Sequence, residues 1–418
     1  MSEHILNQYI SKIEGHGCLN YSHKSGKVRI EIDEGERLFE KLVIGQHYKD
    51  LAFITARICG VCPTSHVMAA TLACENAFGA QVNDSIINLR RALQAAQIIQ
   101  SHVLHDFFFA LPDFLGTKGG LELHEKNPRV FKLATNLKGL ADEVTAVVGG
   151  RAVHPVTPTV GGFLSVPKPK EIEALIVKVK GSQRLALETL ELFANLRYPS
   201  LKNPTEYFTL TKNKKVDMFG DTLVSSEGVE AAASDYQFVI TEKVNAHSTA
   251  KYGEHDGHPM MVGAIARVNL MEDSDFHPKT QRAIKALKIK LPILNSFKNN
   301  LAQAIEIYNF LEEIEISLTD YLFGKNERIK VGYRVKAGTG VGAVEAPRGT
   351  LYHMYEFDEK GYVTKCDIVT PTVQNLTNLE SDANAYLAQN KSVTIPRRER
   401  ELEMLVRAYD PCITCSVH

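Results

Sequence analysis

Residues 83–110 read NDSIINLRRALQAAQIIQSHVLHDFFFA and repeat apolar side chains at steps of three and four positions. This spacing matches the turn of an α-helix, about 3.6 residues, and gathers the apolar side chains on one face. Asn83 and Asp84 stand at the start, where a short polar side chain can cap the first turn. The stretch predicts a long helix that buries the face formed by Ile86, Leu89, Leu93, Ala96, Ile99 and Val103.

Two further segments have the same helical periodicity. Residues 169–193 open with a proline, which suits a first helical turn, and residues 301–322 repeat the pattern. Shorter segments rich in β-branched residues predict strands at 27–32, 236–241 and 260–269. The predicted fold class is mainly α with small β-sheets, an α+β chain built around a central bundle of long helices.

The composition is that of an ordinary globular protein. Of 418 residues, 44% are apolar, 8% aromatic and 23% charged, which excludes disordered, collagen-like and low-complexity classes. No linker rich in proline, glycine or serine interrupts the chain, so we expect residues 1–418 to form a single domain. The 48 basic and 49 acidic residues give a net charge of −1, which predicts no nucleic-acid or anionic-lipid partner.

Cellular location is predicted from the N-terminus and the cysteines. Residues 1–15, MSEHILNQYISKIEG, do not read as a secretory signal, because charges surround the apolar stretch. No apolar run approaches the ~18 residues of a membrane span. Seven cysteines, a low and odd count, do not resemble a secreted disulfide framework. We therefore expect a cytoplasmic protein with no membrane span in this chain.

Two C-x-x-C motifs lie near the two ends of the chain. Residues 57–66 read RICGVCPTSH and residues 410–418 read DPCITCSVH, so each cysteine pair is followed by a histidine. Together they supply four thiolates, a soft sulfur cage that suits zinc, iron–sulfur or another thiophilic metal. Only the fold itself can bring Cys62 and Cys412 together.

A structural zinc site with four cysteine ligands is the plain alternative. The chain is long enough to need no zinc staple, and the second motif lies at the C-terminus, an unusual place for a zinc finger. Gly60 and Pro63 beside the cysteines indicate a tight, preformed turn. A thioredoxin-like redox motif would need a surrounding βαβ pattern, which the sequence lacks.

With these motifs the sequence resembles the large, catalytic subunit of nickel–iron hydrogenases, of the cytoplasmic, cofactor-coupled type. Lys12 stands where the family more commonly has arginine, and Ala264 where proline is usual. The resemblance covers most of the chain and implies the hydrogenase large-subunit fold, with both ends meeting at the metal site. Five further blocks match in the expected order: KIEGH at 12–16, GGRAVHP at 149–155, VGAIARVN at 262–269, EAPRG at 345–349 and VTPT at 369–372.

The resemblance implies a role for each of the four cysteines in the motifs. Cys59 and Cys412 would be terminal ligands of nickel. Cys62 and Cys415 would bridge nickel to an iron that carries carbon monoxide and cyanide. The other three cysteines are expected to be small buried hydrophobes, namely Cys18, Cys74 and Cys366.

Glu14 is the catalytic carboxylate that the resemblance implies. It is followed by Gly15, His16 and Gly17, and the glycines let the backbone approach closely. The family match makes Glu14 the proton acceptor beside the terminal thiolate of Cys412. A carboxylate that takes a proton from a thiol needs a pKa raised by burial.

A second metal site is also implied by the resemblance. Glu40, the carbonyl of Ile368 and His418 would bind magnesium or another divalent ion. Magnesium prefers oxygen donors, so a site with one imidazole is unusual. Relatives commonly lose a C-terminal extension after this histidine, and the sequence is interpreted as that processed form.

Arg348 and Pro347 are candidate cofactor-binding residues above the metals, and Arg348 is also a candidate catalytic residue, the rival base to Glu14. Its guanidinium would donate hydrogen bonds to one cyanide and keep its charge. Thr372 would offer a hydroxyl to the other cyanide, and Asp410, with Asp113 as a further candidate, would pair with Arg348. His66 is close enough to the first motif to form a hydrogen bond with a cysteine sulfur. Four other histidines are expected to be structural: His102, His105, His154 and His353.

The implied function is reversible heterolytic cleavage of molecular hydrogen at a nickel–iron site. Three remaining cysteines cannot hold iron–sulfur clusters, which need about four ligands each, so the electrons would pass to an iron–sulfur small subunit, with further electron-transfer subunits beyond it. The sequence leaves open whether NAD, NADP, a deazaflavin or ferredoxin receives them. The alternatives are a zinc-stapled interaction protein and a metal-free relative from a respiratory complex, which typically lacks the cysteine pairs.

Overall fold

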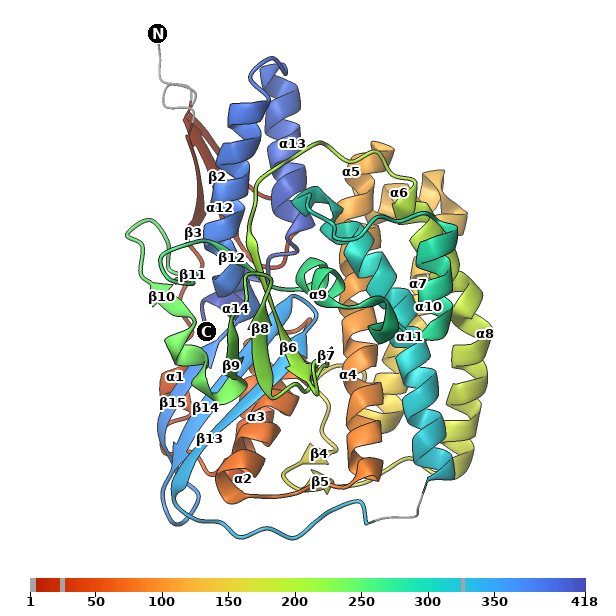
Figure 1. The fold of residues 1–418 in the computed structure, drawn as a ribbon, viewed down its shortest axis with the longest axis vertical. Coiled ribbons are helices and arrows are strands. Elements are labelled where there is room, and N and C mark those ends of the chain that lie inside the picture. Colours follow the sequence, from red (N-terminus) through yellow and green to blue (C-terminus); the bar gives the residue numbers. More distant parts are fainter. Residues whose placement is uncertain (1–4, 23–26, 325–327) are drawn as a thin grey trace.

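Four long helices form a bundle on one side of the molecule (Figure 1). The structure, a computed structural model, describes residues 5–22, 27–324 and 328–418. In the bundle, α4 and α8 each pack against both α7 and α11. The three helices predicted from periodicity are confirmed, and α7 is an addition that the sequence did not reveal. The bundle consists of α4 (Asp84–Leu104), α7 (Pro128–Gly149), α8 (Pro169–Ala194) and α11 (Asn299–Phe323).

The end of the first predicted helix is not α-helical. Residues His105–Ala110 form a π-helical segment that continues α4 into the short helix α5 (Leu111–Leu115). The Asn83 side chain caps α4 by accepting a hydrogen bond from the Ile86 amide over 3.0 Å. π-Helical turns are rare and occur frequently at functional sites.

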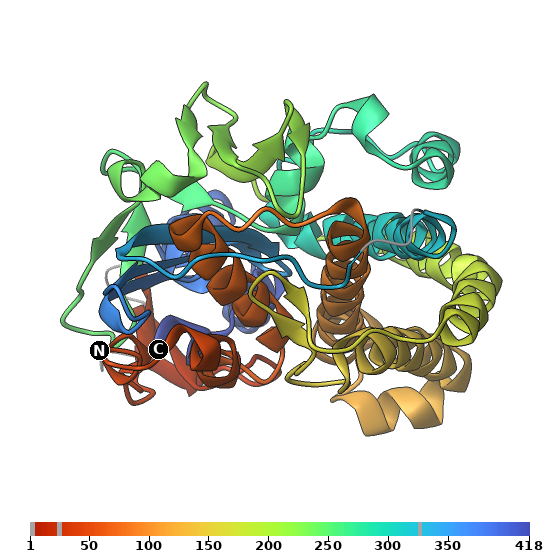
Figure 2. The ribbon, with the colours of Figure 1, turned by 90° about the horizontal axis from the view of Figure 1, so that it is seen from below.

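A three-stranded antiparallel sheet lies on the other side, covered by α3 (Pro63–Phe78) (Figure 2). Its strands are β13 (Gly338–Ala346), β14 (Gly349–Phe357) and β15 (Val363–Val369), in that order. Gly342 lets β13 approach α3, because a Cβ atom there would lie 1.9 Å from the Ala69 carbonyl oxygen. This close contact fixes the helix that follows the first cysteine motif.

The segments around Glu14 and Cys412 meet beside this sheet. The N-terminal strands β1 (Ile5–Tyr9), β2 (Gly17–Ser22) and β3 (Lys27–Ile32) form an antiparallel sheet, and β3 packs against α12 (Pro371–Gln389). Between β1 and β2, Glu14 forms an isolated parallel bridge with Cys412, and its carbonyl accepts a 2.9 Å hydrogen bond from the Ile413 amide. The short helix α14 (Ile413–Ser416) follows directly.

Two of the three predicted strands are wrong. The strand at 27–32 is β3, but residues 236–238 end a 3-10 helix and only Thr241 begins a strand. Of residues 260–269, only Met260 and Met261 are extended, as β12, and α9 (Ala264–Leu270) follows. Gly263, with a φ of 108°, turns the chain into α9, whose first five residues are buried. Burial of this short helix on all sides thus overrides the β-branched composition.

The remaining elements connect these parts and complete the mainly helical fold with small sheets. A mixed sheet has the order β12-β6-β8-β9, with β7 on β6, and β4–β5 and β10–β11 are two-stranded. These elements are α1 (Phe39–Leu42), α2 (Tyr48–Thr55), α6 (Gly120–Lys126), α10 (Pro278–Ala286), α13 (Ile395–Ala408), β4 (Pro158–Thr159), β5 (Gly162–Phe163), β6 (Glu206–Lys212), β7 (Lys215–Val216), β8 (Thr222–Ser225), β9 (Glu230–Ala232), β10 (Thr241–Lys243), β11 (Tyr252–Glu254) and β12 (Met260–Met261).

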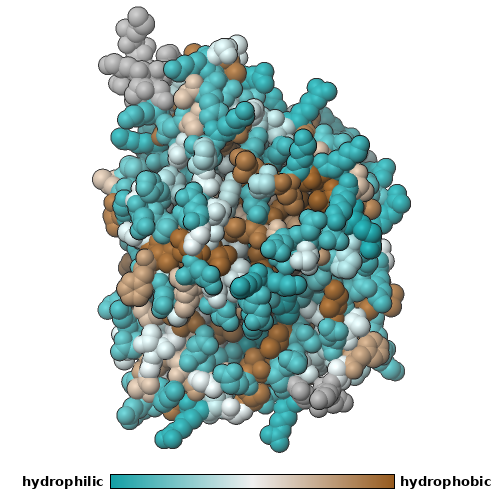
Figure 3. All heavy atoms as spheres, in the orientation of Figure 1, coloured by the Kyte–Doolittle hydropathy of each residue, from teal (hydrophilic) through white to brown (hydrophobic). Residues whose placement is uncertain are grey.

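The surface is mostly hydrophilic on the face seen in Figure 3, with apolar side chains gathered in small patches between hydrophilic ones. Among the described helices, none combines the length and the apolar character that a bilayer crossing requires. The chain's apolar side chains instead fill its core, which extends from the bundle to the N-terminal sheet.

Candidate metal centre

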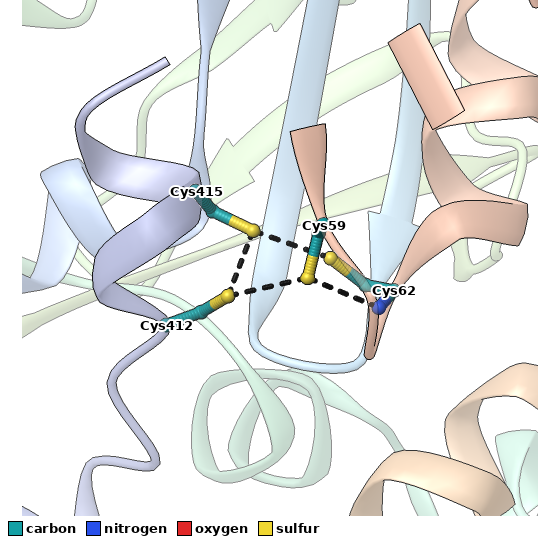
Figure 4. Close-up of side chains that lie close together, drawn as sticks. All are labelled: Cys59, Cys62, Cys412 and Cys415. Carbon is teal, nitrogen blue, oxygen red and sulfur yellow. Dashed lines mark hydrogen bonds between the residues drawn. The ribbon is translucent and has the colours of Figure 1, made fainter. Parts of the chain in front are cut away.

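The four cysteines of the two motifs converge in the interior (Figure 4). Their sulfur atoms all lie within 4.8 Å of one another, and each residue is buried. Cys59 Sγ lies 3.4 Å from Cys412 Sγ, and Cys62 Sγ lies 3.4 Å from Cys415 Sγ. The fold therefore pairs the first cysteine of one motif with the first of the other, and the second with the second.

Local structure aims the sulfurs at one point. Cys62 directly precedes α3 and Cys412 directly precedes α14, so each motif sits at a helix start. The amides of Val61 and Cys62 donate to Cys59 Sγ over 3.2 and 3.3 Å, which closes a tight turn around this sulfur. Amide donors and a helix N-terminus both favour a thiolate.

Arg37 ties the two motifs to each other, a role that the sequence did not reveal. Its Nη2 donates to the carbonyl of Ile58 over 2.5 Å and also to the carbonyl of Thr414. One guanidinium thus binds one carbonyl from each motif. Because 377 residues separate Arg37 from Thr414, no local sequence pattern could indicate this contact.

The thiols of the two motifs differ in pKa. Burial alone would raise the pKa of Cys59, but hydrogen bonds from Cys412, Cys415 and Cys62 lower it well below its usual value. Hydrogen bonds with Cys415 and Cys62 likewise lower the pKa of Cys412 against the effect of burial. Burial and hydrogen bonds together raise the pKa of Cys415. A buried group that concentrates negative charge on sulfur is suited to a thiophilic metal, which would replace the shared protons.

A small cavity beside the sulfurs tests whether a larger metal centre fits. It has a volume of about 10 Å³, room for one water-sized group, and Pro347, Arg348 and Thr372 line it with Cys62, Cys412 and Cys415. Arg348 Nη1 is buried and has no hydrogen-bond partner among the described residues. An unpartnered buried cation donor calls for an acceptor, and an anionic diatomic ligand on a metal would supply one. The residues therefore fit a nickel–iron centre with small ligands.

The opposite side of the Arg348 guanidinium is anchored to Asp410. Arg348 Nε donates to the Asp410 carbonyl over 2.7 Å, and Nη2 donates to Oδ1 over 2.8 Å. The predicted contact with Asp113 is wrong. The Asp113 carboxylate, carried by α5, instead binds Lys12 and Arg407, each over 2.5 Å, so two other cations already satisfy it.

Glu14 touches both Cys412 and the backbone of the C-terminal motif. Its Oε2 accepts from Cys412 Sγ over 3.1 Å and from the Thr414 amide over 3.1 Å. Burial and the charge of Cys412 raise the pKa of Glu14 to about 8. Gly15, with a φ of 84°, permits this approach, because a Cβ atom there would lie 2.7 Å from Ile413 Cβ.

The predicted second metal ligands meet around Ile368. Glu40 Oε1 accepts from the Ile368 amide over 2.8 Å, and His418 Nε2 lies 2.8 Å from the Ile368 carbonyl oxygen. Beside them, a cavity of about 640 Å³ is also lined by Glu242 and Lys251, which bind each other over 2.7 Å. One carboxylate, one carbonyl and one imidazole therefore lie together, and Glu242 and Lys251 are neighbours that the sequence did not predict.

The histidines differ in their relation to the sulfurs. His66 Nε2 lies 4.0 Å from Cys415 Sγ, while its Nδ1 lies 3.0 Å from His353 Nε2. Burial lowers the pKa of His66 to about 3, so the ring is neutral and can donate one hydrogen bond to sulfur. His102 and His105 bind protein partners, Glu306 and Gln303 respectively.

The other three cysteines form no disulfide. Cys18 and Cys74 are buried, as expected for small hydrophobes, whereas Cys366 is partly exposed. The four motif cysteines form the one group of three or more potential metal ligands within the described ranges.

A buried charge network supports the loop that carries Arg348. The sequence did not predict this network. Arg267 donates to the carbonyls of Ala346 and Pro347 over 2.9 and 3.0 Å. Its guanidinium is neutralised by Glu306 and Glu345, over 2.6 and 2.7 Å. The backbone just before Arg348 is therefore held by a fully buried arginine.

Comparisons with known proteins agree with this geometry. A sequence model of the family "Nickel-dependent hydrogenase" matches residues 37–127 and 226–418. The alpha subunit of sulfhydrogenase 1 of Pyrococcus furiosus is 34% identical over 423 residues, which cover 99% of this chain and 97% of that protein. A vhu F420-non-reducing hydrogenase subunit of Methanococcus voltae is 30% identical, covering 89% and 95%.

The fold is similar to that of a solved structure. The crystal structure of an NAD+-reducing NiFe-hydrogenase in the H2-reduced state superposes with a TM-score of 0.86, covers 100% of both chains and is 24% identical. This confirms the predicted large-subunit fold. Together with the family match over more than half of the sequence, it confirms the resemblance noted from the motifs: the chain belongs to the nickel-dependent hydrogenase family.

Proposed function

We propose that this chain is the catalytic subunit of an enzyme that reversibly cleaves molecular hydrogen at a nickel–iron centre. The observation that carries the proposal is the convergence of four buried cysteine sulfurs within 4.8 Å, two from each end of the chain. Four thiolates alone would also suit zinc. A structural zinc site would need neither Arg348 nor Glu14, and both lie beside these sulfurs.

Cys59 and Cys412 are assigned as terminal ligands of nickel, and Cys62 and Cys415 as bridges between nickel and iron. The small cavity is lined by Cys62, Cys412 and Cys415 and not by Cys59. Both sulfurs assigned as bridges therefore lie beside the space for small ligands, together with the sulfur of Cys412. Cys412, which Glu14 contacts, is assigned to nickel alone.

Carbon monoxide and cyanide are assigned to the side of the metal centre where Pro347, Arg348 and Thr372 lie. The free Nη1 of Arg348 is suited to donate to one cyanide. Thr372 Oγ1 accepts a hydrogen bond from the Cys412 amide over 3.0 Å, which leaves its hydroxyl hydrogen for a second anionic ligand. Asp410 neutralises the guanidinium and orients it toward the cavity.

Proton transfer is assigned to Cys412 and Glu14. When bound, the nickel–iron centre supplies the redox chemistry of heterolytic hydrogen cleavage. The thiolate of Cys412 accepts the proton, and the 3.1 Å hydrogen bond delivers it to Glu14 Oε2. Because the raised pKa of Glu14, about 8, lies near neutrality, its carboxylate can both accept and release a proton.

A divalent ion, magnesium by preference, is assigned to Glu40, the Ile368 carbonyl and His418. These donors supply two oxygens and one imidazole nitrogen, and magnesium commonly completes its six positions with water. The adjacent cavity of about 640 Å³ has room for such waters. The ion would tie His418 to β15 and so support the segment that carries Cys412 and Cys415.

The electrons released by hydrogen cleavage must pass to another chain, which we propose is an iron–sulfur small subunit. Outside the four motif cysteines, the described part of the chain holds no second cluster of ligands. Arg57 and Gly60, which flank Cys59, are exposed, so the surface beside this turn is suited to pass electrons to a docked chain. Relatives named as alpha subunits support a multi-subunit enzyme, and the cysteines, free of disulfides, support a cytoplasmic location.

Metal analysis and infrared spectroscopy of the protein purified with its partner subunits test the proposal. We expect nickel and iron in similar amounts, with carbon monoxide and cyanide bands. Cys415→Ser should abolish the bands, whereas Cys74→Ser, the same change at a buried cysteine of α3, should leave them intact. Zinc alone would support the zinc-stapled alternative, and absence of any metal would support the metal-free respiratory relative.

A further inference from the structure

Asp410 holds an unusual backbone conformation two residues before Cys412. Its φ of 51° lies in the left-handed region, which residues other than glycine rarely adopt. Such a conformation persists only where surrounding contacts determine it. Arg348 supplies contacts on one side, through the carbonyl and Oδ1, and Gln303 of α11 supplies the contact on the other, through Oδ2.

The contact with Asp410 fixes the orientation of the Gln303 amide. The Arg348 guanidinium, which has only donors, binds the carbonyl and Oδ1 of Asp410, so the carboxylate of this ion pair faces Gln303 as a hydrogen-bond acceptor. The Gln303 atom 3.1 Å from Asp410 Oδ2 must therefore be Nε2, the donor. Its Oε1, an acceptor, then faces His105 Nδ1 at 2.5 Å, so this ring nitrogen must carry a hydrogen.

The second ring nitrogen of His105 also faces an acceptor. His105 Nε2 lies 2.6 Å from the backbone carbonyl oxygen of Arg407, and a carbonyl oxygen cannot donate. Both ring nitrogens must therefore be protonated. Neutral histidine has a hydrogen on only one of its two ring nitrogens, so this pattern of partners requires the imidazolium cation.

A counter-ion is present in the next residue. Asp106 Oδ1 lies 3.6 Å from His105 Nδ1, and neither Asp106 oxygen has a hydrogen-bond partner among the residues described. Both side chains are almost completely buried, at the start of the π-helical segment. Burial lowers the pKa of His105, but the charge of Asp410 and the contact with Asp106 outweigh it and raise the pKa to about 9.

These groups form a line of alternating charge through the interior. Arg348 and His105 are cations, Asp410 is an anion, and Gln303 bridges Asp410 and His105. Burial raises the pKa of Asp106 to about 7 even though His105 acts to lower it, and the ionised form of this carboxyl offsets the charge of His105. The line holds Asp410 through Oδ2, whereas Arg348 holds it through Oδ1 and the carbonyl.

We propose that His105 is a permanent buried imidazolium that, through Gln303, fixes the Asp410 carboxylate and so positions the Arg348 guanidinium over the metal centre. His105 and Gln303 are thus positioning residues of the hydrogen-cleaving reaction, and this role rests on the proposed function. The charge state of His105 rests on the hydrogen-bond pattern alone.

Neutron diffraction from crystals of the deuterated complex tests the charge state directly. We expect a deuteron on both Nδ1 and Nε2 of His105. A deuteron on only one of these two nitrogens would overturn the proposal. This measurement does not depend on activity, so it remains decisive even if the protein lacks the nickel–iron centre and the proposed function fails.

Two variants with a matched control test the positioning role in the holoenzyme. Gln303→Met removes both hydrogen bonds, and Gln303→Glu keeps the volume but cannot donate to ionised Asp410. Asn309→Leu removes a buried amide of the same helix, one that accepts from the His277 amide and does not touch Asp410. It measures the general cost of losing a buried amide in α11.

We expect both Gln303 variants to shift the cyanide infrared bands and to lower hydrogen oxidation by roughly 10²-fold, the cost of a small misplacement. Asn309→Leu should leave the bands unchanged. Unshifted bands in both Gln303 variants, with normal nickel and iron content, would overturn the positioning role. If both variants fail to take up metal, His105→Gln provides the infrared test, with the same shift expected and an unchanged spectrum counting against the role.

Discussion

Glu14 and Cys412 are joined by a 3.1 Å hydrogen bond between carboxylate and thiol, although 398 residues separate them in the sequence. The same two residues form a parallel backbone bridge, so the side-chain contact rests on a fixed main-chain geometry. A proton acceptor from the N-terminal segment is thereby attached to a metal ligand from the C-terminal segment. Proper closure of the two ends is therefore a condition for proton transfer.

Glu14→Gln should nearly abolish turnover while preserving the metal centre. The amide keeps the shape of the side chain but cannot accept a proton, so we expect hydrogen–deuterium exchange with solvent to fall ~10²–10⁴-fold. Nickel and iron content and the infrared bands should remain intact. Isotope-exchange mass spectrometry on the complex measures the first effect, and metal analysis with infrared spectroscopy measures the second.

Glu380→Gln is the matched control for this prediction. Glu380 is a partly buried glutamate whose Oε1 accepts from the Ile30 amide over 2.8 Å, away from the sulfurs. Its exchange activity should stay close to wild type. Normal turnover in Glu14→Gln combined with an inactive Arg348→Lys variant that retains its metals would transfer the role of base to Arg348, against the raised pKa of its guanidinium.

Local sequence patterns were sufficient for the long helices and the metal-binding cysteines. Apolar spacing predicts α4, α8 and α11 because each buries one continuous face, and C-x-x-C spacing is a local property of a turn. The predicted strands at 236–241 and 260–269 failed because tertiary burial decided between two backbone states that the composition leaves open.

The supporting contacts were beyond the reach of the sequence because they join distant segments. Arg267 pairs with Glu306 and Glu345 across 39 and 78 residues, and nothing local distinguishes these acids from surface glutamates. The resemblance predicts that Asp113 pairs with Arg348, but in the structure Lys12 and Arg407 bind it. Which cation reaches which carboxylate is decided by packing, and packing is not a local property.

Arg267→Met should destabilise the protein strongly. The change leaves Glu306 and Glu345 buried without their cation, and an uncompensated buried charge costs roughly 3–5 kcal/mol. We expect a clear fall in the thermal unfolding midpoint, measured by calorimetry on the complex. Adding Glu306→Gln and Glu345→Gln should restore part of the midpoint, because no charge is then left unpaired.

An exposed ion pair provides the control for Arg267. Arg184 pairs with Glu188 while its side chain is 83% exposed, so Arg184→Met should change the midpoint little. A triple variant no more stable than Arg267→Met alone would show that the lost contacts to the Ala346 and Pro347 carbonyls, not the stranded charges, dominate the effect.

Glu40→Gln should remove the response of the protein to magnesium. A bound ion stabilises the folded state, by ~2.7 kcal/mol when its concentration is 100 times the dissociation constant. We expect added magnesium to raise the unfolding midpoint of the wild type and not of the variant, with magnesium content measured by elemental analysis. Glu36→Gln, at an exposed residue lining the same cavity, should respond like the wild type. Equal magnesium content in Glu40→Gln and wild type would contradict the assigned site.

The buried carboxylate of Glu313 should make stability depend on acid pH. Burial acts to raise its pKa, but hydrogen bonding by His277 and the charge of Arg91 outweigh this and lower the pKa below its ordinary value of 4.5. The folded state therefore binds a proton here less readily than the unfolded state. Its stabilising contribution is complete above the ordinary pKa and is lost progressively as pH falls below about 5.

The unfolding midpoint of the complex, measured by calorimetry from neutral pH down to about pH 4, tests this contribution of Glu313. Glu313→Gln removes the titrating group, so we expect a lower midpoint at neutral pH, where the ion pair is lost, and a shallower decline toward acid pH. Glu143→Gln is the matched control, since Glu143 pairs with Lys178 while both side chains are more than 40% exposed. Because exposed pairs contribute little, this control should keep the wild-type decline. A decline in Glu313→Gln as steep as in the wild type would mean that another buried carboxylate sets the acid sensitivity.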